Sequence, residues 1–177
     1  MAIKTIFLDR DGVINKDIGY LHKIDDFKFN EGIFEACLFF LSLDYQIIIV
    51  SNQSGIARGY YTEDEYKKLT NWMINKFSIK NICILDAFHC PHGPDSDCRC
   101  RKPMPGMLIE AKKKYNIDMN RSWMIGDKET DIEAANLAGI SNTILVRSSD
   151  LIDEYKSKSK FIINSIKDSE KIIKKFK

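Results

Sequence analysis

One stretch near the start of the chain restricts the possible folds more than any other. Residues 5–8 are apolar or β-branched, and they are followed at once by Asp9, Arg10, Asp11 and Gly12. A short run of this kind predicts a buried strand. Ligands bind at the carboxyl ends of the strands in an open α/β sheet, so the two aspartates are expected at a substrate site. The alternative is a plain turn, because Asp-Gly is a common hairpin signal.

The two aspartates also point to a metal ion. Side chains two residues apart on a strand face the same way, and two close carboxylates repel each other unless a cation lies between them. Hard oxygen ligands suit a divalent ion such as Mg²⁺. Asp127 also follows a predicted strand, at 122–125, so we expect it to complete the site with Asp9 and Asp11. Asp131 is expected to brace the loop or a lysine.

Strand-like and helix-like segments alternate along the whole chain, which predicts a parallel sheet covered by helices. A helix is expected after Asn30, whose side chain can cap it, and another after the capping box that Thr62 and Glu65 form. The fold class is therefore α/β and Rossmann-like, with residues 1–177 as a single domain. The remaining predicted strands are 46–50, 82–88, 142–146 and, more weakly, 161–164.

Length and composition agree with one globular core. The chain has 177 residues, of which 44% are hydrophobic. With 27 basic and 25 acidic residues, the net charge of +2 gives no reason to expect nucleic acid or an anionic membrane as a partner. The sequence contains neither a signal-peptide pattern nor an apolar run of about 18 residues. We therefore expect a cytoplasmic monomer.

A cluster of soft ligands follows the third predicted strand. Cys90, His92, Cys98 and Cys100 lie within eleven residues and match the closed Cys₃His set of a structural zinc site. Cys98 and Cys100 are poorly placed to bridge each other, because disulfide geometry is hard to meet across one residue. The alternative is a loop with incidental thiols. The favoured interpretation is a zinc-binding loop.

Two further segments have the chemistry of phosphate binding. Ser51, Asn52, Gln53 and Ser54 precede a glycine after the second strand, and small polar side chains of this kind let a backbone approach a phosphate closely. A plain turn explains this stretch equally well. Lys102 directly follows the zinc loop. A lysine held there can deliver its ammonium to a phosphoryl group with little loss of entropy.

Taken together, these motifs resemble the haloacid dehalogenase phosphatase superfamily and, within it, the D-glycero-D-manno-heptose 1,7-bisphosphate 7-phosphatase family. The resemblance covers about residues 3–150. Ser51 and Val13 depart from it, since threonine is common at both positions, and the segment between His92 and Cys98 is shorter than in some members. The segments that carry the resemblance are 9–12, 51–59, 90–92, 98–103 and 126–128.

The resemblance implies a phosphoric monoester hydrolase with catalytic Mg²⁺, structural zinc and no large cap domain. Asp9 would form an aspartyl-phosphate, while Asp11 would serve first as general acid and then as base. Mg²⁺ would be held by Asp9, Asp127 and the Asp11 carbonyl oxygen. The implied substrate is a heptose 1,7-bisphosphate, cleaved at C7 in ADP- or GDP-heptose biosynthesis for surface polysaccharide. The substrate-binding residues would be Asp17, Gly19, Tyr20, Ser51, Asn52, Gln53, Ser54, Arg101, Lys102 and Lys128.

Lys102 and Mg²⁺ suffice to neutralise the reacting phosphoryl group. The additional positive charges of Arg101 and Lys128 therefore favour a substrate with two phosphates. The alternative for Arg101 is that it braces the zinc loop.

Among enzymes, the rival interpretation is a histidinol-phosphate phosphatase or another small sugar-phosphate phosphatase. A receiver-like signalling module would need an acceptor aspartate at the end of the third strand, whereas Asp86 lies inside the predicted strand. A binding module stabilised by zinc, without enzymatic activity, would not explain why Asp9, Asp11 and Asp127 follow predicted strands.

Overall fold

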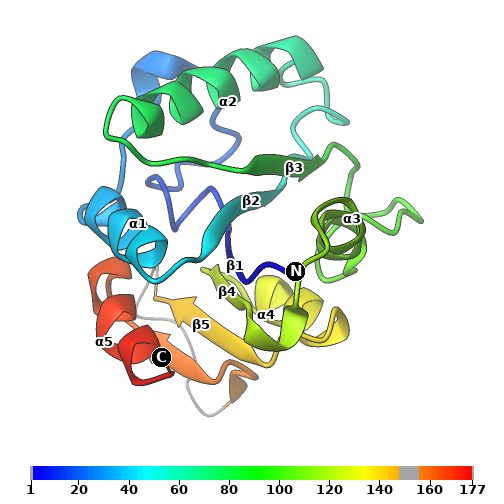
Figure 1. The fold of residues 1–177 in the computed structure, drawn as a ribbon. Helices are drawn as coiled ribbons and strands as arrows, with labels where there is room; N and C mark the ends of the chain where they lie inside the picture. The colour runs from blue at the N-terminus through cyan, green and yellow to red at the C-terminus, as the bar shows by residue number, and fades with distance from the viewer. Residues whose placement is uncertain (1, 148–155, 177) are drawn as a thin grey trace.

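The computed structural model describes residues 2–147 and 156–176 (Figure 1). These residues form a six-stranded sheet in the order β3-β2-β1-β4-β5-β6, with every neighbouring pair parallel. The α/β class with a parallel sheet is therefore confirmed, and the described residues include no large cap over it. The strands are β1 Thr5–Leu8, β2 Gln46–Asn52, β3 Asp86–Cys90, β4 Trp123–Gly126, β5 Asn142–Val146 and β6 Phe161–Ile163.

Within the described residues, five α-helices flank the sheet: α1 Ile33–Ser42, α2 Glu63–Ser78, α3 Gly106–Tyr115, α4 Glu129–Leu137 and α5 Ser169–Ile173. Short 3₁₀ turns lie at Ile24–Asp26, Met119–Arg121, Ile166–Asp168 and Lys174–Phe176. In Figure 1, α1 and α5 lie on one side of the sheet and α3 and α4 on the other. This two-sided cover explains why the central strands β1 and β4 are buried at every position.

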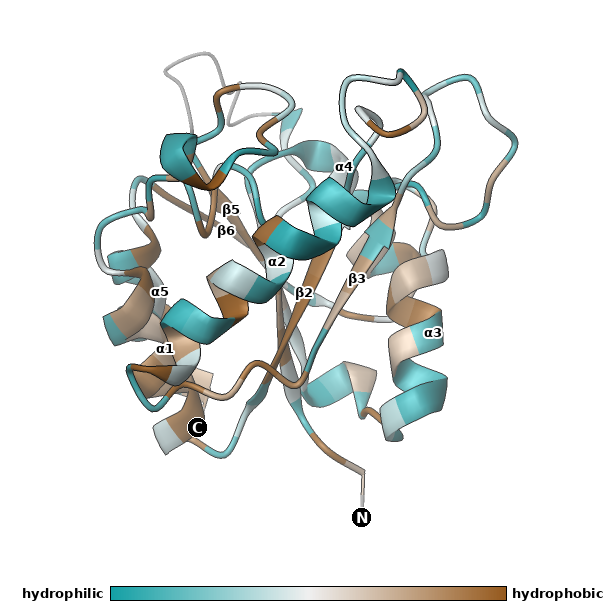
Figure 2. Cartoon of the chain, turned by 90° about the horizontal axis from the view of Figure 1, so that it is seen from above, coloured by the Kyte–Doolittle hydropathy of each residue, from teal (hydrophilic) through white to brown (hydrophobic). Residues whose placement is uncertain are grey.

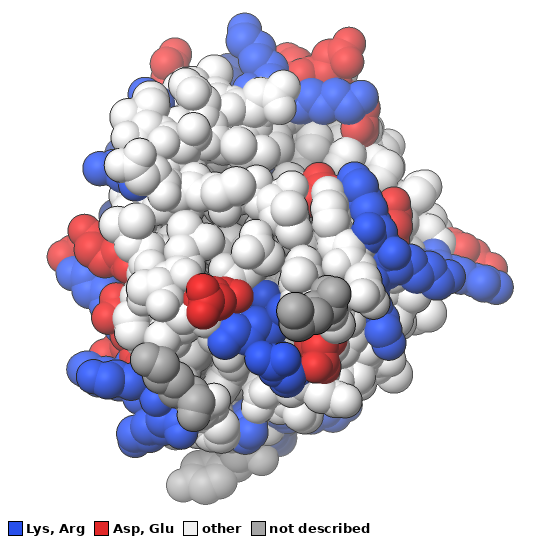
Figure 3. Space-filling model, viewed as in Figure 1, with Lys and Arg blue, Asp and Glu red and all other residues white. Residues whose placement is uncertain are grey.

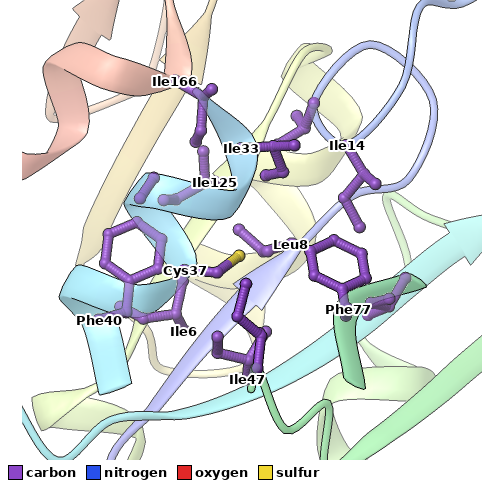
Figure 4. Packing of buried hydrophobic residues seen from close by; sticks show 14 of the residues in the cluster. Ile6, Leu8, Ile14, Ile33, Cys37, Phe40, Ile47, Phe77, Ile125 and Ile166 are labelled. Carbon is purple, nitrogen blue, oxygen red and sulfur yellow. The ribbon is translucent and has the colours of Figure 1, made fainter. Parts of the chain in front are cut away.

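The core is divided by the sheet into two clusters. Ile6 and Leu8 of β1 belong to the cluster under α1 and α2, whereas Phe7 between them belongs to the cluster under α3 and α4. This division follows from the alternation of side chains along a strand. Figure 4 shows the first cluster, where Leu8 points toward Ile33 of α1 and Phe77 of α2.

Four strands differ from the predicted bounds: β4 by one residue at each end, β6 by one residue at one end, and β2 and β3 by more. The third strand was expected at 82–88, but β3 is Asp86–Cys90, because pairing with β2 begins only at Ile48 opposite Asp86. Ile82 is buried at the end of α2 and belongs to the core without joining the sheet. β2 extends two residues beyond the prediction, to Asn52. Both strands therefore run directly into the segments predicted to bind zinc and phosphate.

The predicted cap of the first helix was wrong. α1 begins at Ile33 after Gly32, which has a left-handed φ of 84°, and no side chain caps it. The Asn30 amide instead donates hydrogen bonds to the carbonyl oxygens of Gly12 and Val13, both at 3.0 Å. Asn30 therefore braces the turn after β1. The capping box of α2, by contrast, is present as predicted.

The loops that follow the strands rise together at one end of the sheet, and both chain termini lie at the opposite end (Figure 2). The face that carries the termini has lysine and arginine side chains interspersed with aspartate and glutamate (Figure 3). That face therefore lacks a field of a single sign, in keeping with the small net charge. None of the helices within 2–147 and 156–176 has the length and apolar character of a membrane span.

Candidate active site

Three neighbouring strands deliver polar side chains to one cavity. Asp9 follows β1, Ser51 lies near the end of β2, and Lys128 follows β4, and these are neighbouring strands in the order β2-β1-β4. The cavity has a volume of about 310 Å³. It is lined by Asp9, Asp11, Asp17, Gly19, Tyr20, Ser51, Asn52, Gln53, Ser54, Tyr61 and Lys128. The structure thus brings together side chains that the sequence placed in four separate segments.

Lys102 follows the predicted zinc loop, contacts Asp9 of the cavity wall and is only 4% exposed. Its Nζ donates to Asp9 Oδ1 at 2.6 Å and to the Val50 carbonyl oxygen at 2.8 Å, and it lies 2.5 Å from Asp131 Oδ1. Burial alone would lower the pKa of Lys102, yet the Asp131 and Asp9 carboxylates hold it above its usual value. The ammonium therefore stays charged in a buried site.

Asn52 holds the backbone of Lys102 in place. Its side-chain oxygen accepts a hydrogen bond from the Lys102 amide at 3.0 Å, and its side-chain nitrogen donates to the Lys102 carbonyl oxygen at 3.0 Å. This reciprocal pair joins positions fifty residues apart in the sequence. The Asn52 amide, expected to bind phosphate, is thus engaged in positioning the lysine. No pattern in the sequence predicts this pairing.

Three buried carboxylates form a possible cation site. Ligand oxygens of Asp9, Asp127 and Asp131 all lie within 4.8 Å of one another. Asp127 Oδ1 is buried and has no hydrogen-bond partner among the described residues. Burial raises the pKa of Asp127 to about 8, and the Asp9 charge adds to this. Burial also raises the pKa of Asp9 to about 7, although Lys102 opposes the change. An orphaned oxygen among buried carboxylates fits a hard divalent cation.

Gly12 makes room for this arrangement. It has a φ of +89°, and a Cβ atom at this position would lie 2.2 Å from Asp127 Oδ2. Only glycine combines that backbone conformation with the close approach of the carboxylate.

Asp11 is placed by a turn, because β1 ends at Leu8 and strand alternation no longer applies at Asp11. Its carboxylate accepts two hydrogen bonds from Arg10 Nη2, at 2.8 and 3.1 Å, and one from Asn15 at 2.9 Å. The Gln53 amide adds another at 3.2 Å. These hydrogen bonds hold the Asp11 carboxylate at the wall of the cavity, which Asp11 lines.

Arg10, Asn15 and Tyr61 belong to the site but were not predicted from the sequence. Arg10 is 1% exposed and Asn15 is fully buried, which is rare for residues of these types. The Tyr61 hydroxyl donates to Gln53 Oε1 at 2.6 Å and so orients the amide that meets Asp11. A charged residue directly between two candidate catalytic acids was the one signal that could have drawn attention to Arg10.

The loop after β1 is tied to the cavity by charge. Asp17 Oδ1 accepts a hydrogen bond from the Gly19 amide at 2.9 Å, and Asp17 Oδ2 accepts one from Lys128 Nζ at 3.1 Å. Lys128 Nζ also lies 3.9 Å from Asp127 Oδ2. Lys128 therefore links this loop to the carboxylate cluster.

The four predicted zinc ligands lie together. Cys100 Sγ is 3.0 Å from Cys90 Sγ and 3.2 Å from His92 Nδ1, while Cys98 Sγ is 3.6 Å from Cys90 Sγ. All four ligand atoms lie within 4.8 Å of one another, as a closed tetrahedral site requires. One ligand, Cys90, ends β3, so the cluster anchors the loop to the sheet.

Arg101 lies on the zinc loop and not at the cavity. Its guanidinium donates to the His92 carbonyl oxygen at 3.3 Å, and Arg101 is not among the residues that line the cavity. This geometry favours the bracing role that the sequence left open.

Comparisons with known proteins agree with these features. The family model described as HAD-hyrolase-like matches residues 99–169. A D-glycero-alpha-D-manno-heptose-1,7-bisphosphate 7-phosphatase of Photorhabdus laumondii is 50% identical over 153 residues, which are 82% of this chain and 84% of that relative. A D-glycero-beta-D-manno-heptose-1,7-bisphosphate 7-phosphatase of Pasteurella multocida is 44% identical, and the match covers 98% of each chain.

A solved structure extends the comparison to the fold. The D,D-heptose 1,7-bisphosphate phosphatase from B. bronchiseptica, complexed with magnesium and phosphate, matches with a TM-score of 0.87 and 27% identity. The match covers 99% of this chain and 100% of that one.

The raised pKa values of Asp9 and Asp127 predict that Mg²⁺ binding depends on pH. Without metal, the native state holds more protons than the unfolded state between about pH 4 and pH 8, so the free energy of unfolding falls as the pH rises. Mg²⁺ must displace these protons, and its affinity should be roughly tenfold or more higher at pH 8 than at pH 6. Thermal unfolding with and without Mg²⁺ measures this as a larger increase in Tm at pH 8.

Asp127→Asn should abolish the Mg²⁺-dependent increase, whereas Glu35→Gln, an exposed carboxylate on α1, should leave it unchanged. Equal increases in Tm at both pH values would contradict the assignment.

The Cys₃His cluster predicts one tightly bound zinc ion per chain. Native mass spectrometry of protein purified without chelator should show it, and Cys98→Ser should lower the Tm and weaken substrate binding together, because Lys102 follows the loop. Cys83→Ser is the matched control, since Cys83 is an exposed thiol outside the cluster. Metal-free protein with an unchanged Tm would refute a structural zinc.

Proposed function

Since the chain belongs to the D-glycero-D-manno-heptose 1,7-bisphosphate 7-phosphatase family of the haloacid dehalogenase superfamily, we propose that it removes the C7 phosphate of a heptose 1,7-bisphosphate. The observation that carries this proposal is that relatives match over nearly the whole chain while Asp9, Asp11 and Ser51 line one cavity, with the Lys102 ammonium bound to Asp9. Relatives named for the α and the β anomer fall in the same range of identity. The proposal therefore covers both anomers.

Asp9 is the proposed nucleophile. It lies at the end of the central strand, with one oxygen bound to Lys102 at 2.6 Å. One Asp9 oxygen attacks phosphorus, the bond from phosphorus to the sugar oxygen breaks, and an aspartyl-phosphate forms. Water then attacks phosphorus, releasing inorganic phosphate and restoring the carboxylate.

Asp11 is the proposed general acid and base. In the first half it gives a proton to the departing sugar oxygen, and in the second half it takes one from the attacking water. The hydrogen bonds from Arg10, Asn15 and Gln53 support this role, because they fix the orientation of the Asp11 carboxylate at the cavity wall.

Lys102 and Ser51 are the proposed partners of the phosphoryl oxygens. Lys102 brings a permanent positive charge to the floor, and Ser51 lies at the end of β2 beside it. Preorganised groups of this kind stabilise the charge that the transferring phosphoryl group carries.

Asp9 and Asp127 would hold Mg²⁺, together with the carbonyl oxygen of Asp11. When bound there, Mg²⁺ neutralises phosphate charge so that an anionic carboxylate can approach phosphorus. Cys90, His92, Cys98 and Cys100 would hold zinc, which keeps the loop that precedes Lys102 in one conformation. In this proposal Mg²⁺ is the catalytic cation and zinc is the structural one, and the two ions have separate sets of ligands.

Several wider properties belong to the same proposal. The sugar bisphosphate is its only proposed partner, and we propose a cytoplasmic monomer that acts as a single domain over residues 1–177. The pathway is the synthesis of ADP- or GDP-activated heptose for surface polysaccharide. Bacterial relatives of the same family support this placement.

Kinetics on both anomers of heptose 1,7-bisphosphate and on histidinol phosphate, in the presence of Mg²⁺, tests the substrate. We expect the higher kcat/KM on one of the bisphosphates. Phosphorus NMR of the product should show that the phosphate at C1 remains. A higher kcat/KM for histidinol phosphate would reject the proposal in favour of that rival activity.

Asp9→Asn should abolish turnover, because an amide is nearly isosteric with the carboxylate but is a poor nucleophile. The rate should fall by about a thousandfold or more, with an unchanged circular dichroism spectrum. Retention of a tenth of the wild-type rate would contradict the covalent role of Asp9.

A further inference from the structure

A cavity also lies at the amino ends of the strands, opposite the carboxyl ends that carry the candidate active site. Lys4 precedes β1, Tyr45 precedes β2, and Arg121 ends the turn before β4. The cavity has a volume of about 270 Å³. It is lined by Lys4, Tyr45, Asn120, Arg121, Trp123, Asn142 and Phe176. None of these residues lines the candidate active site, so the two cavities are separate.

Three of the lining residues form an aromatic wall, which consists of Tyr45, Trp123 and Phe176. Tyr45 and Trp123 are buried, whereas Phe176 is 46% exposed. The Phe176 ring meets the Trp123 ring with centroids 5.3 Å apart and planes at 76°. The wall therefore combines ring surfaces fixed in the core with one ring that is partly open to solvent. A flat apolar group can pack against such a surface.

The charged side chains that line this cavity are positive. Lys4 and Arg121 are among the lining residues, which include no aspartate or glutamate of the described chain. Within residues 2–147 and 156–176, neither side chain makes an ion pair or a hydrogen bond. The Lys4 ammonium instead lies 4.4 Å from the centroid of the Tyr45 ring, a cation–π contact. Both charges are therefore available to an anion.

Lys160 adds a third cation beside the cavity. Its ammonium lies 4.5 Å from the centroid of the Phe176 ring and donates to Asn142 Oδ1 at 2.8 Å. Lys158 and Lys167 of the same C-terminal segment pair with glutamates, whereas none of the described carboxylates pairs with Lys160. Figure 3 shows lysine and arginine side chains close together on the face that carries the termini. The cation cluster at this cavity consists of Lys4, Arg121 and Lys160.

Hydrogen bonds fix the walls of the cavity. The Gln46 amide donates to the Lys4 carbonyl oxygen at 2.9 Å, which joins β2 to β1. The Asn142 side-chain amide donates to the Asn120 carbonyl oxygen at 3.3 Å, which joins β5 to the turn before β4. Asp118 begins that turn, and its carboxylate accepts a hydrogen bond from the Asn120 amide at 3.1 Å. The cavity is thus preformed, and a ligand loses little binding free energy to ordering of the walls.

We propose that this cavity binds a nucleoside phosphate, with its base against the aromatic wall and its phosphates on the cation cluster. A volume of about 270 Å³ is near the lower limit of about 300–1,000 Å³ for small-molecule sites, so the cavity holds one ring system and leaves charged groups at the surface. The planar fork of Arg121 suits a phosphate. Stacking tolerates any base, because every base has an aromatic face. The site should therefore require a base and phosphates together.

Single-stranded nucleic acid also combines bases with phosphates. The free nucleotide is favoured because the cavity holds one base, whereas a strand needs a basic groove that follows its backbone. The net charge of +2 gives no wider field that would attract a polyanion.

Trp123 provides a direct probe of binding, because the chain has two tryptophans and the other, Trp72, lies in α2. In a Trp72→Phe protein, ATP added without Mg²⁺ should change the fluorescence of Trp123 saturably. ATP should bind about tenfold more tightly than adenosine or tripolyphosphate, because only ATP uses both the rings and the cations. Arg121→Met, Lys4→Met and Phe176→Leu should each raise the Kd for ATP about fivefold or more, with an unchanged circular dichroism spectrum.

Two variants are controls. Lys112→Met removes an exposed lysine of α3 outside the cavity, and Ser51→Ala alters the candidate active site. Both should leave the Kd for ATP within about twofold. Isothermal titration calorimetry on the protein with both tryptophans measures the same constants. Because no turnover is measured, the result is independent of the proposed function.

Four results would overturn the nucleotide site. These are the absence of ATP binding by both methods, equal affinities for ATP and tripolyphosphate, an unchanged Kd in Arg121→Met, and tighter binding of a uridine oligonucleotide than of ATP. Loss of ATP binding in Ser51→Ala with normal binding in Arg121→Met would place the nucleotide in the active site and would also reject the proposal.

Discussion

The buried ammonium of Lys102 is the interaction on which the rest of the site depends. It lies within 2.6 Å of Asp9 and 2.5 Å of Asp131, and almost no solvent reaches it. A charge in such a place persists only when carboxylates surround it, and removing one partner of a buried pair costs about 3–5 kcal/mol in proteins generally. Asp9 after β1 and Asp131 in the first turn of α4 therefore hold the lysine as much as the lysine orients them.

Both loops around Lys102 are arranged to keep that ammonium in place. The cluster of predicted zinc ligands ends two residues before Lys102. The Asn52 side-chain amide forms hydrogen bonds with both the backbone amide and the carbonyl oxygen of Lys102. β2 and β3 run side by side into these two segments, with Asn52 opposite Cys90. The loop proposed to bind zinc and the loop proposed to bind phosphate are thus neighbours because β2 and β3 are neighbours. Substitution of a proposed zinc ligand should therefore also change the binding of the reacting phosphate.

Much of the fold could be predicted because it depends on local patterns. Apolar strands alternating with helical periods indicated the parallel sheet, and the ends of those strands carried Asp9, Ser51 and Asp127. The bounds of β3 could not be predicted, because Ile82 is as apolar as a strand residue and only pairing with β2 decides where the strand begins. Asn30 was assigned as a cap for the same reason, since its distant partners at Gly12 and Val13 leave no mark in the local sequence.

The sequence by itself determined which chemical groups are present and, through strand periodicity, which end of the sheet they occupy. The four zinc ligands were recognisable because they lie within eleven residues. Only the tertiary structure decided the partners of each group: Asp11 with Arg10, Lys102 with Asp131, and Arg58 with Tyr20. The physical reason is how far apart along the chain the interacting residues lie. Helical and strand patterns are set by neighbours a few residues apart, whereas these charges and rings meet across loops whose relative positions follow from the order of the strands and the packing of the core.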